Sequence, residues 1–347
     1  MRHFIPLFFF TQLLFSCFSS SAQLLSKPFG IKICGPEFGD TKFPGVYGVD
    51  YIYPDSLELQ YFYNKGFRML DLPFRWERVQ PQLMGTLDSV EMQRMQSFIA
   101  QSNKIGLQVK LTLQNFGRYH DKNKVYTVGS KEMPSACLED LWKKLALAFI
   151  NCDNIYGFQI MNEPHDIWNT PWAKIAQNAL NAIRTVNKIH TIFISGSEYA
   201  NSVDWKINND KLKNIVDSCD NVVFEAHCYF DRDFTGRYLN SNGNTNKAFE
   251  YNVLNTNAGI EVIRPFIKWL KKNNKKGYIG EYGIPDDDPR WLEVLDKFLN
   301  YISANGVNGA YWAAGPWWGN YRLSIEPRNG IDRPQMQVLE KYKSISE

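Results

Sequence analysis

Outside its first residues, the sequence has no apolar run of the roughly 20 residues that a membrane-spanning helix needs. It also lacks an excess of either charge, with 39 Lys and Arg against 36 Asp and Glu in 347 residues, a net charge of +3. Without a strongly basic balance, nucleic acid is not indicated as a partner. The chain contains no Pro/Ser/Thr-rich linker and no internal repeat, so nothing suggests several modules.

Cysteine is scarce and scattered. The six cysteines lack the short spacings of metal-binding motifs, so we expect neither a metal nor another cofactor. Their spacing does not decide any disulfide pairing. If the first 22 residues are removed, an odd number remains and at least one thiol is free or intermolecular: Cys34, Cys137, Cys152, Cys219 and Cys228.

The N-terminus has the features of an export signal. Arg2 precedes an apolar run over 4–15, and the small residues of 20–22 suit a cleavage site. We therefore expect a signal peptide over 1–22 and a secreted protein. The alternative is a lipoprotein at the cell surface or in the periplasm, with a lipid anchor on Cys17.

The rest of the chain alternates between short apolar runs and helical patterns, and 44% of all residues are hydrophobic. Such alternation is typical of parallel βαβ units. Eight strands are predicted, at 29–34, 67–73, 107–114, 155–161, 191–195, 222–227, 278–281 and 307–312. Helices are predicted at 55–65, 88–106, 134–150, 171–187, 258–274 and 289–305, with only 210–217 available between the fifth and sixth strands. Residues 23–347 are thus predicted to form one (β/α)₈ barrel, with a doubly wound sheet as the alternative. The Asn- and Gly-rich segment 237–257 is either a surface loop or a wall of the binding cleft.

Two of the predicted strands end in a glutamate. Glu163 is followed by Pro164, which stops a strand, and Glu281 lies between Gly280 and Gly283. A barrel would bring such strand ends together at its carboxyl face. Two carboxyl groups roughly 5 Å apart are what a retaining glycosidase needs. An Asn-Glu-Pro sequence by itself is equally well explained as a polar turn.

Several motifs occur in an order that resembles glycoside hydrolase family 5, in particular its endo-β-1,4-glucanases. They span nearly all of the chain after the signal: 35–39 (GPEFG), 73–81 (PFRWERVQP), 115–119 (NFGRY), 162–166 (NEPHD), 227–229 (HCY), 280–283 (GEYG) and 312–319 (WAAGPWWG). The resemblance implies that Glu163 is the general acid/base and Glu281 the nucleophile of a retaining hydrolase. It implies a monomer that acts on a β-glucan.

The resemblance also implies roles for neighbouring residues. Asn162 would bind the 2-hydroxyl of the attacked sugar, Tyr229 would bond the nucleophile and His227 would lie beside the acid. Trp312 would floor the subsite of that sugar. Further candidates for binding substrate are Gln114, Asn115, Trp205, Trp317 and Trp318, although tryptophans of this kind are as often core residues.

Two positions depart from the family pattern. Asp71 stands where the family has an arginine that supports the nucleophile, and Gln114 stands where it usually has a histidine. A carboxylate beside Glu281 should raise the pKa of that nucleophile. Either Arg68 or Arg75 would then supply the missing charge and preserve hydrolysis. The alternatives are another β-glycan as substrate (mannan, xyloglucan or a β-1,3-glucan) or a carbohydrate-binding protein without turnover.

Overall fold

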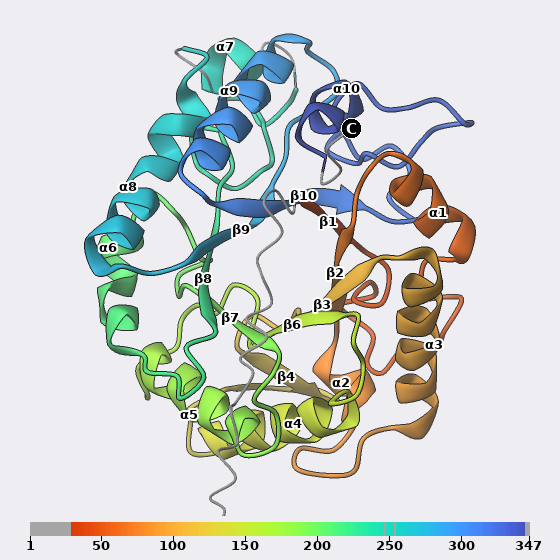
Figure 1. Ribbon diagram of the computed structural model, residues 1–347, viewed down its shortest axis with the longest axis vertical. Coiled ribbons are helices and arrows are strands. Elements are labelled where there is room, and N and C mark those ends of the chain that lie inside the picture. Colours follow the sequence, from red (N-terminus) through yellow and green to blue (C-terminus); the bar gives the residue numbers. More distant parts are fainter. Residues whose placement is uncertain (1–28, 246–247, 253–254, 344–347) are drawn as a thin grey trace, which may run out of the picture.

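Eight parallel strands close into a barrel in the computed structural model, which describes residues 29–245, 248–252 and 255–343. Around the barrel the order is β1-β10-β9-β8-β7-β6-β3-β2 (Figure 1). The strands are β1 (Gly30–Ile33), β2 (Met69–Phe74), β3 (Gln108–Leu113), β6 (Ile155–Gln159), β7 (Thr191–Ser195), β8 (Val222–His227), β9 (Gly277–Tyr282) and β10 (Asn308–Ala314). The predicted (β/α)₈ barrel is confirmed, and the doubly wound sheet is wrong. The predicted signal peptide and Cys17 lie outside the described residues.

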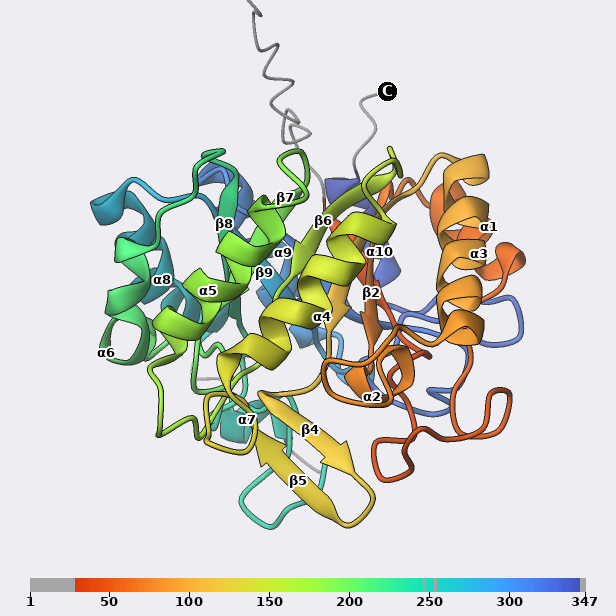
Figure 2. The ribbon, with the colours of Figure 1, turned by 90° about the horizontal axis from the view of Figure 1, so that it is seen from below.

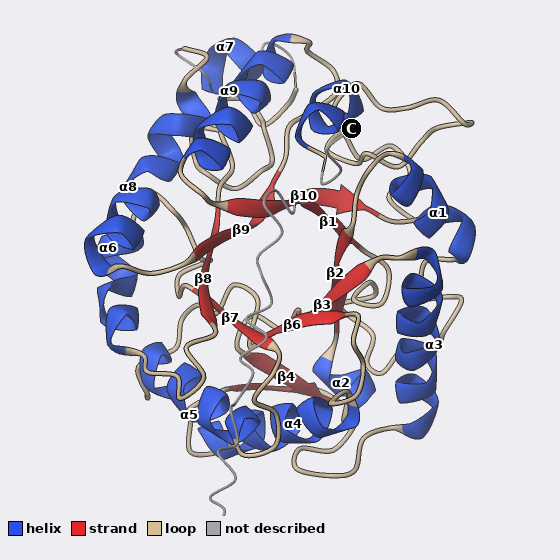
Figure 3. Cartoon of the chain, in the orientation of Figure 1, coloured by secondary structure: helices blue, strands red, loops and turns tan. Residues whose placement is uncertain are grey.

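Helices cover the outer face of the barrel (Figure 3). They are α1 (Ser56–Asn64), α3 (Ser89–Ile105), α4 (Ser135–Ala148), α5 (Trp172–Arg184), α6 (Trp205–Asn209), α8 (Ala258–Asn273) and α9 (Arg290–Ala304), and a 3₁₀ turn, Asp210–Asn214, follows α6. Asp55 and Asp88 cap α1 and α3 by accepting bonds from first-turn amides. Gly106, at a φ of 91°, ends α3 in the left-handed conformation that glycine adopts without strain. In the described part of the chain, every helix is too short or too polar to cross a bilayer.

Several short elements were not predicted from the sequence. They are α2 (Trp76–Val79), the antiparallel hairpin of β4 (Arg118–Asp121) and β5 (Lys124–Thr127), α7 (Ala248–Asn252), and α10 (Met336–Leu339) with a following 3₁₀ turn, Glu340–Tyr342. The helix α6 also lies before the predicted 210–217, of which only 210–214 is helical, as a 3₁₀ turn. The hairpin, α2 and α7 lie at one end of the barrel (Figure 2), which is the end that β2 reaches just before α2 begins. These elements therefore surround the carboxyl ends of the strands.

The interior of the barrel is apolar at one level and charged at the next. A cluster of Met69, Tyr156, Phe193, Val223, Tyr278 and Ala310 forms the apolar level. Beside it lie four fully buried charged residues, Lys32, Asp71, Lys110 and Glu225. In the sheet register Lys32 is opposite Asp71, and Asp71 is opposite Lys110. Because buried charges are costly unless paired, each of these side chains needs a group of opposite charge beside it.

Candidate active site

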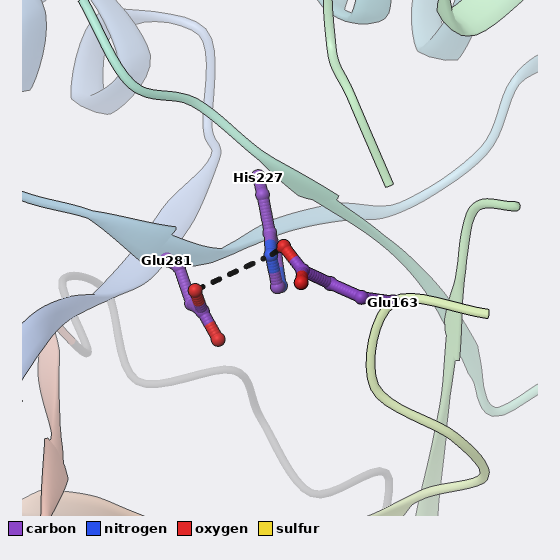
Figure 4. A group of neighbouring side chains, drawn as sticks. All are labelled: Glu163, His227 and Glu281. Atoms are coloured by element: carbon purple, nitrogen blue, oxygen red, sulfur yellow. Dashed lines mark hydrogen bonds and ion pairs between the residues drawn. The ribbon is translucent and has the colours of Figure 1, made fainter. Parts of the chain in front are cut away.

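The two glutamates at the strand ends face each other across an imidazole. Glu163 follows β6, Glu281 belongs to β9 and His227 ends β8. One carboxylate oxygen from each glutamate and one ring nitrogen of His227 all lie within 4.8 Å of one another. Figure 4 shows the ring of His227 between the two carboxylates. Glu163 has a φ of 45°, a left-handed conformation that is strained for a residue with a side chain and recurs at functional sites.

His227 connects the two carboxylates. Its Nδ1 is 2.7 Å from Oε1 of Glu163 and 3.5 Å from Oε2 of Glu281, and its Nε2 is 3.6 Å from Oε1 of Glu225. Burial alone would lower the pKa of His227, but the carboxylates of Glu281 and Glu163 raise this pKa to about 9. At neutral pH the ring is therefore a cation that is hydrogen-bonded to Glu163 and ion-paired with Glu281.

Glu281 is held by two donors besides this ring. The ammonium of Lys32 donates to its Oε1 at 2.7 Å, and the hydroxyl of Tyr229 donates to its Oε2 at 2.8 Å. Burial alone would raise the pKa of Glu281, but the charges of His227 and Lys32 lower this pKa to about 2. The expectation that Asp71 would raise the pKa of the nucleophile is therefore wrong.

The supporting cation comes from β1, and neither of the expected arginines supplies it. Arg68 donates to the carbonyl oxygens of Tyr63 and Phe67. Arg75 donates to the carbonyl oxygens of Glu37 and Gln114. Both arginines hold backbone in place, and the expectation that one of them replaces the missing charge is corrected to Lys32.

Asp71 does not add an unbalanced charge to the site. Its Oδ2 is 2.9 Å from Nζ of Lys110 and 3.8 Å from Nζ of Lys32, and all three side chains are fully buried. Its Oδ1 accepts the hydroxyl of Thr112. The carboxylate is thus the counterion of two lysines. The sequence signal for this arrangement was a single charged residue in each of three apolar strands, but its meaning depends on which strands are neighbours.

Asn162 presents an amide toward the same cation. Its Oδ1 accepts from Nζ of Lys32 at 3.1 Å and from Gln159 at 3.4 Å. Its Nδ2 is buried and has no hydrogen-bond partner among the described residues. Gln114 is similar, since its Oε1 is buried without a partner in the described part of the chain. Both amides thus have a buried polar atom whose hydrogen bond no described residue supplies.

Asn115 is engaged inside the protein. Its Nδ2 donates to both carboxylate oxygens of Glu77, at 2.9 and 2.8 Å, and its Oδ1 accepts the amide of Trp76 at 2.8 Å. The side chain is 1% exposed. The prediction that Asn115 binds substrate is therefore corrected: it fixes the turn after β3 onto α2.

Three of the four candidate tryptophans form one aromatic group at the end of β10 and just after it. Trp312 is half-buried, packs edge-on against Trp318 at 5.5 Å between ring centroids, and lies 5.7 Å from Nζ of Lys32. Trp317 is 41% exposed and stacks on Phe38 at 6.4 Å. These rings offer apolar faces on the Lys32 side of the site, as a bound sugar requires.

Trp205 is not part of this group. It is 0% exposed and packs against Phe266 and Trp269 of α8, at 4.5 and 5.6 Å between ring centroids. Its prediction as a cleft residue is corrected to a core residue that anchors α6.

A pocket of about 310 Å³ opens beside Glu163 on the other side of the site. It is lined by Glu163, Tyr199, Asn201, His227, Tyr229, Asp233, Phe234 and Thr235. Tyr199, which was not predicted, is 51% exposed and stacks on His165 at 4.1 Å. Glu198, Tyr199 and Ala200 all have positive φ, between 52° and 61°, so strained backbone presents this ring. Its sequence signal was only an aromatic residue after a predicted strand.

The same cluster is also the set of described side chains whose geometry suits a metal ion, Glu163, His227 and Glu281. Its carboxylates are already balanced by charge, because Lys32 lies 2.7 Å from Glu281 and the protonated ring of His227 lies 2.7 Å from Glu163. Lys32 and His227 thus supply the positive charge that pairs with these carboxylates.

The barrel carries two facing carboxylates at its strand ends, with a cation between them and aromatic rings on one side. This arrangement is typical of a glycoside hydrolase. The family model for cellulase (glycosyl hydrolase family 5) matches residues 35–317. The chain belongs to this family, and the predicted family is confirmed.

Relatives and solved structures agree with this assignment. Endo-beta-1,4-glucanase B of Emericella nidulans is 31% identical over 319 residues, which cover 90% of each chain. The structure of Pseudomonas stutzeri endoglucanase Cel5A in complex with cellobiose is 37% identical, with a TM-score of 0.82, and covers 92% of this chain and 93% of that one. An endo-beta-1,4-glucanase of Xanthomonas axonopodis pv. citri is 29% identical, with a TM-score of 0.83 and coverage of 92% and 98%.

Proposed function

We propose that this protein is a retaining endo-β-1,4-glucanase with Glu163 as acid/base and Glu281 as nucleophile. The observation that carries the proposal is the approach of the two carboxylates to within 4.8 Å, on either side of His227. Retaining enzymes hold their carboxyl groups at about 5–5.5 Å, whereas inverting enzymes leave roughly 6.5–9.5 Å for a water molecule. The observed spacing is shorter than the range of the inverting enzymes and so supports the retaining mechanism.

In the first step, a carboxylate oxygen of Glu281 bonds to the anomeric carbon while the bond from that carbon to the leaving oxygen breaks. Glu163 gives its proton to the leaving oxygen, and the shortened glucan departs. The short bond from His227 to Glu163 holds a proton between Nδ1 and Oε1. When this proton moves onto Oε1, Glu163 becomes the acid that the step requires.

In the second step, water attacks the anomeric carbon and gives a proton to Glu163, and the carboxylate of Glu281 leaves. Two inversions restore the original configuration. Glu281 suits both steps, because it is ionised at neutral pH and is a good leaving group, as its lowered pKa indicates. The free Nδ2 of Asn162 and the ring of Trp312 are placed to bind the sugar between the carboxylates.

The preference for β-1,4-linked glucose is inferred from the names of the relatives and from the cellobiose bound to the Pseudomonas structure. Two departures from the family pattern favoured a protein without turnover, Asp71 in place of an arginine and Gln114 in place of a histidine. The ammonium of Lys32 donates to Glu281 at 2.7 Å, so the first of these two arguments loses its basis.

The test is hydrolysis of carboxymethyl cellulose, mannan, xyloglucan and a β-1,3-glucan by the purified protein, with products separated by chromatography. We expect cello-oligosaccharides of several lengths from the first substrate. Proton NMR at early times should show the β-anomer as the first product. An α-anomer, or cleavage of a different glycan in preference, would reject the corresponding part of the proposal.

We also propose that the enzyme is exported, as the sequence of 1–22 predicts, and that it acts as a monomer. Intact mass measurement of the protein from culture medium should give a chain that starts near Gln23. A chain that starts at Cys17 with an added lipid would instead show anchoring. Light scattering at micromolar concentration should give the mass of one chain.

A further inference from the structure

Six charged side chains form a closed ring inside the barrel, and we call it the charge ring. It runs from Glu281 to Lys32 (2.7 Å), Asp71 (3.8 Å), Lys110 (2.9 Å), Glu225 (2.5 Å) and His227 (3.6 Å), and returns to Glu281 (3.5 Å). Acidic and basic groups alternate throughout. Five strands contribute, β9, β1, β2, β3 and β8. With His227 protonated, the ring has three negative and three positive charges and is neutral.

Lys32 is the member of the ring that contacts two groups of the reaction centre. Its ammonium donates to Oε1 of Glu281 at 2.7 Å and to Oδ1 of Asn162 at 3.1 Å. The contact with Asn162 turns the amide so that Nδ2, not Oδ1, remains free for a sugar hydroxyl. One cation therefore fixes both the nucleophile and the amide beside it.

We propose that Lys32 is the positioning residue for catalysis: it keeps Glu281 ionised and aims the amide of Asn162, while Asp71 serves as its permanent counterion. This inference rests on the proposed function and deepens it. When Glu281 becomes an ester, its negative charge disappears, and Lys32 would be left buried beside a neutral group. Asp71, 3.8 Å away, then keeps the ammonium paired until the carboxylate returns.

Lys32 is protonated while Glu281 is ionised. Burial by itself lowers the pKa of Lys32, but the carboxylates of Glu281, Asp71 and Glu225 raise it above its ordinary value. The charged groups nearest Glu281 are Lys32 from β1 and His227 from β8, with Glu163 beyond the imidazole and Asp71 beyond the ammonium. The titratable groups that also face it are Tyr229 after β8, Tyr321 after β10 and Cys34 after β1.

The test compares Lys32→Met with the double variant Lys32→Met/Asp71→Asn. The single change leaves the interior with one extra negative charge, whereas the double change removes a cation and its counterion together. If Lys32 only stabilises the fold, the double variant should regain activity together with thermal stability. If Lys32 acts on Glu281, stability should return without activity.

The substrate is 2,4-dinitrophenyl β-cellobioside, whose leaving group needs no acid, so the rate reports on Glu281 and not on Glu163. For Lys32→Met we expect kcat/KM at pH 6 to fall about tenfold to a hundredfold, the cost of one charge-assisted hydrogen bond. The acid limb of the pH profile should move upward by about one pH unit or more. In the double variant we expect Tm to recover, while kcat/KM stays low and the acid limb stays shifted.

The second readout is the rate at which the 2-deoxy-2-fluoro analogue of this substrate labels Glu281, followed by mass spectrometry. In both variants we expect labelling to be slowed as much as kcat/KM. Two results would overturn the inference. One is labelling within threefold of the wild-type rate together with an unchanged acid limb. The other is a double variant in which activity returns together with Tm. If the wild-type protein is neither labelled nor active, the proposed function itself has failed, which is a separate result.

Discussion

The two sides of the active site are built differently. On the side of β1 and β9, the side chain of Glu281 is 6% exposed and accepts bonds from Lys32 and Tyr229, and it belongs to the charge ring. On the side of β6, the side chain of Glu163 is 19% exposed, its backbone is strained, and its partner is the ring of His227. It borders a pocket of about 310 Å³.

This difference matches what the two roles require. A nucleophile must stay ionised at every stage except the ester, so fixed positive charge and burial behind donors suit it. An acid/base must give and regain a proton in each cycle, so it needs a route to solvent and a partner that can share the proton. The nucleophile side is therefore rigid and charged, and the acid side is open.

The change with the largest expected effect is on the rigid side. Glu281→Gln removes the nucleophile, and we expect the rate to fall by about 10⁴-fold or more on every substrate, because no other group can form the ester. The assay is release of reducing ends, together with Tm. Glu293→Gln, at an exposed position of α9, is the matched control and should keep wild-type activity. If the rate of Glu281→Gln is within a hundredfold of the wild-type rate, Glu281 is not the nucleophile and the comparison of the two sides fails.

On the open side, Glu163→Gln should have an effect that depends on the leaving group. Hydrolysis of cellopentaose should fall by about 10²–10⁴-fold, the usual contribution of a general acid. Formation of the ester from 2,4-dinitrophenyl β-cellobioside should be affected far less, because dinitrophenolate leaves without a proton. Burst kinetics separate the two steps. Equal losses on both substrates would contradict the assignment of Glu163 as the acid.

His227 links the two sides, and its pKa makes stability depend on pH. Because its pKa is raised to about 9, the charged ring contributes stability that is fully present below its ordinary value of 6.5 and is lost as pH rises through about 9. We expect the free energy of unfolding to fall across this interval by about 3 kcal/mol, as a pKa raised from 6.5 to about 9 implies.

The measurement is urea unfolding at several pH values for wild type and His227→Gln. The variant should lack this slope, and its activity should be low at all pH values because both carboxylates lose their shared partner. A slope that persists in His227→Gln would assign the titration to another group.

The smallest expected effect concerns the pocket. Tyr199→Ala removes an exposed ring beside Glu163, and we expect KM for cellopentaose to rise about twofold to tenfold with little change in kcat, as a lost aromatic contact implies. Tyr47→Ala removes an exposed tyrosine that pairs with Arg94 and is the control. A lower kcat at unchanged KM would mean that Tyr199 positions Glu163 through His165 instead of binding sugar.

Periodicity and end signals were enough to predict the barrel. The predicted bounds of β7 and β8 agree with the structure, and Asp55, Asp88 and Gly106 mark helix ends as expected. Such signals are local, so they can be read from neighbouring residues. The hairpin of β4 and β5 was missed because its strands are short, polar and partly exposed, whereas the equally short β1 is fully buried and apolar around Lys32.

The sequence by itself determined the alternation of strands and helices, the family, and the two glutamates, because strand ends and motifs are contiguous in the chain. Tertiary structure decided that Lys32, 249 residues from Glu281, supplies the cation, that Asp71 is balanced, and that Trp205 lies in the core. The physical reason is that the energy of a buried charge depends on the groups around it, and closure of the barrel brings those groups from distant strands.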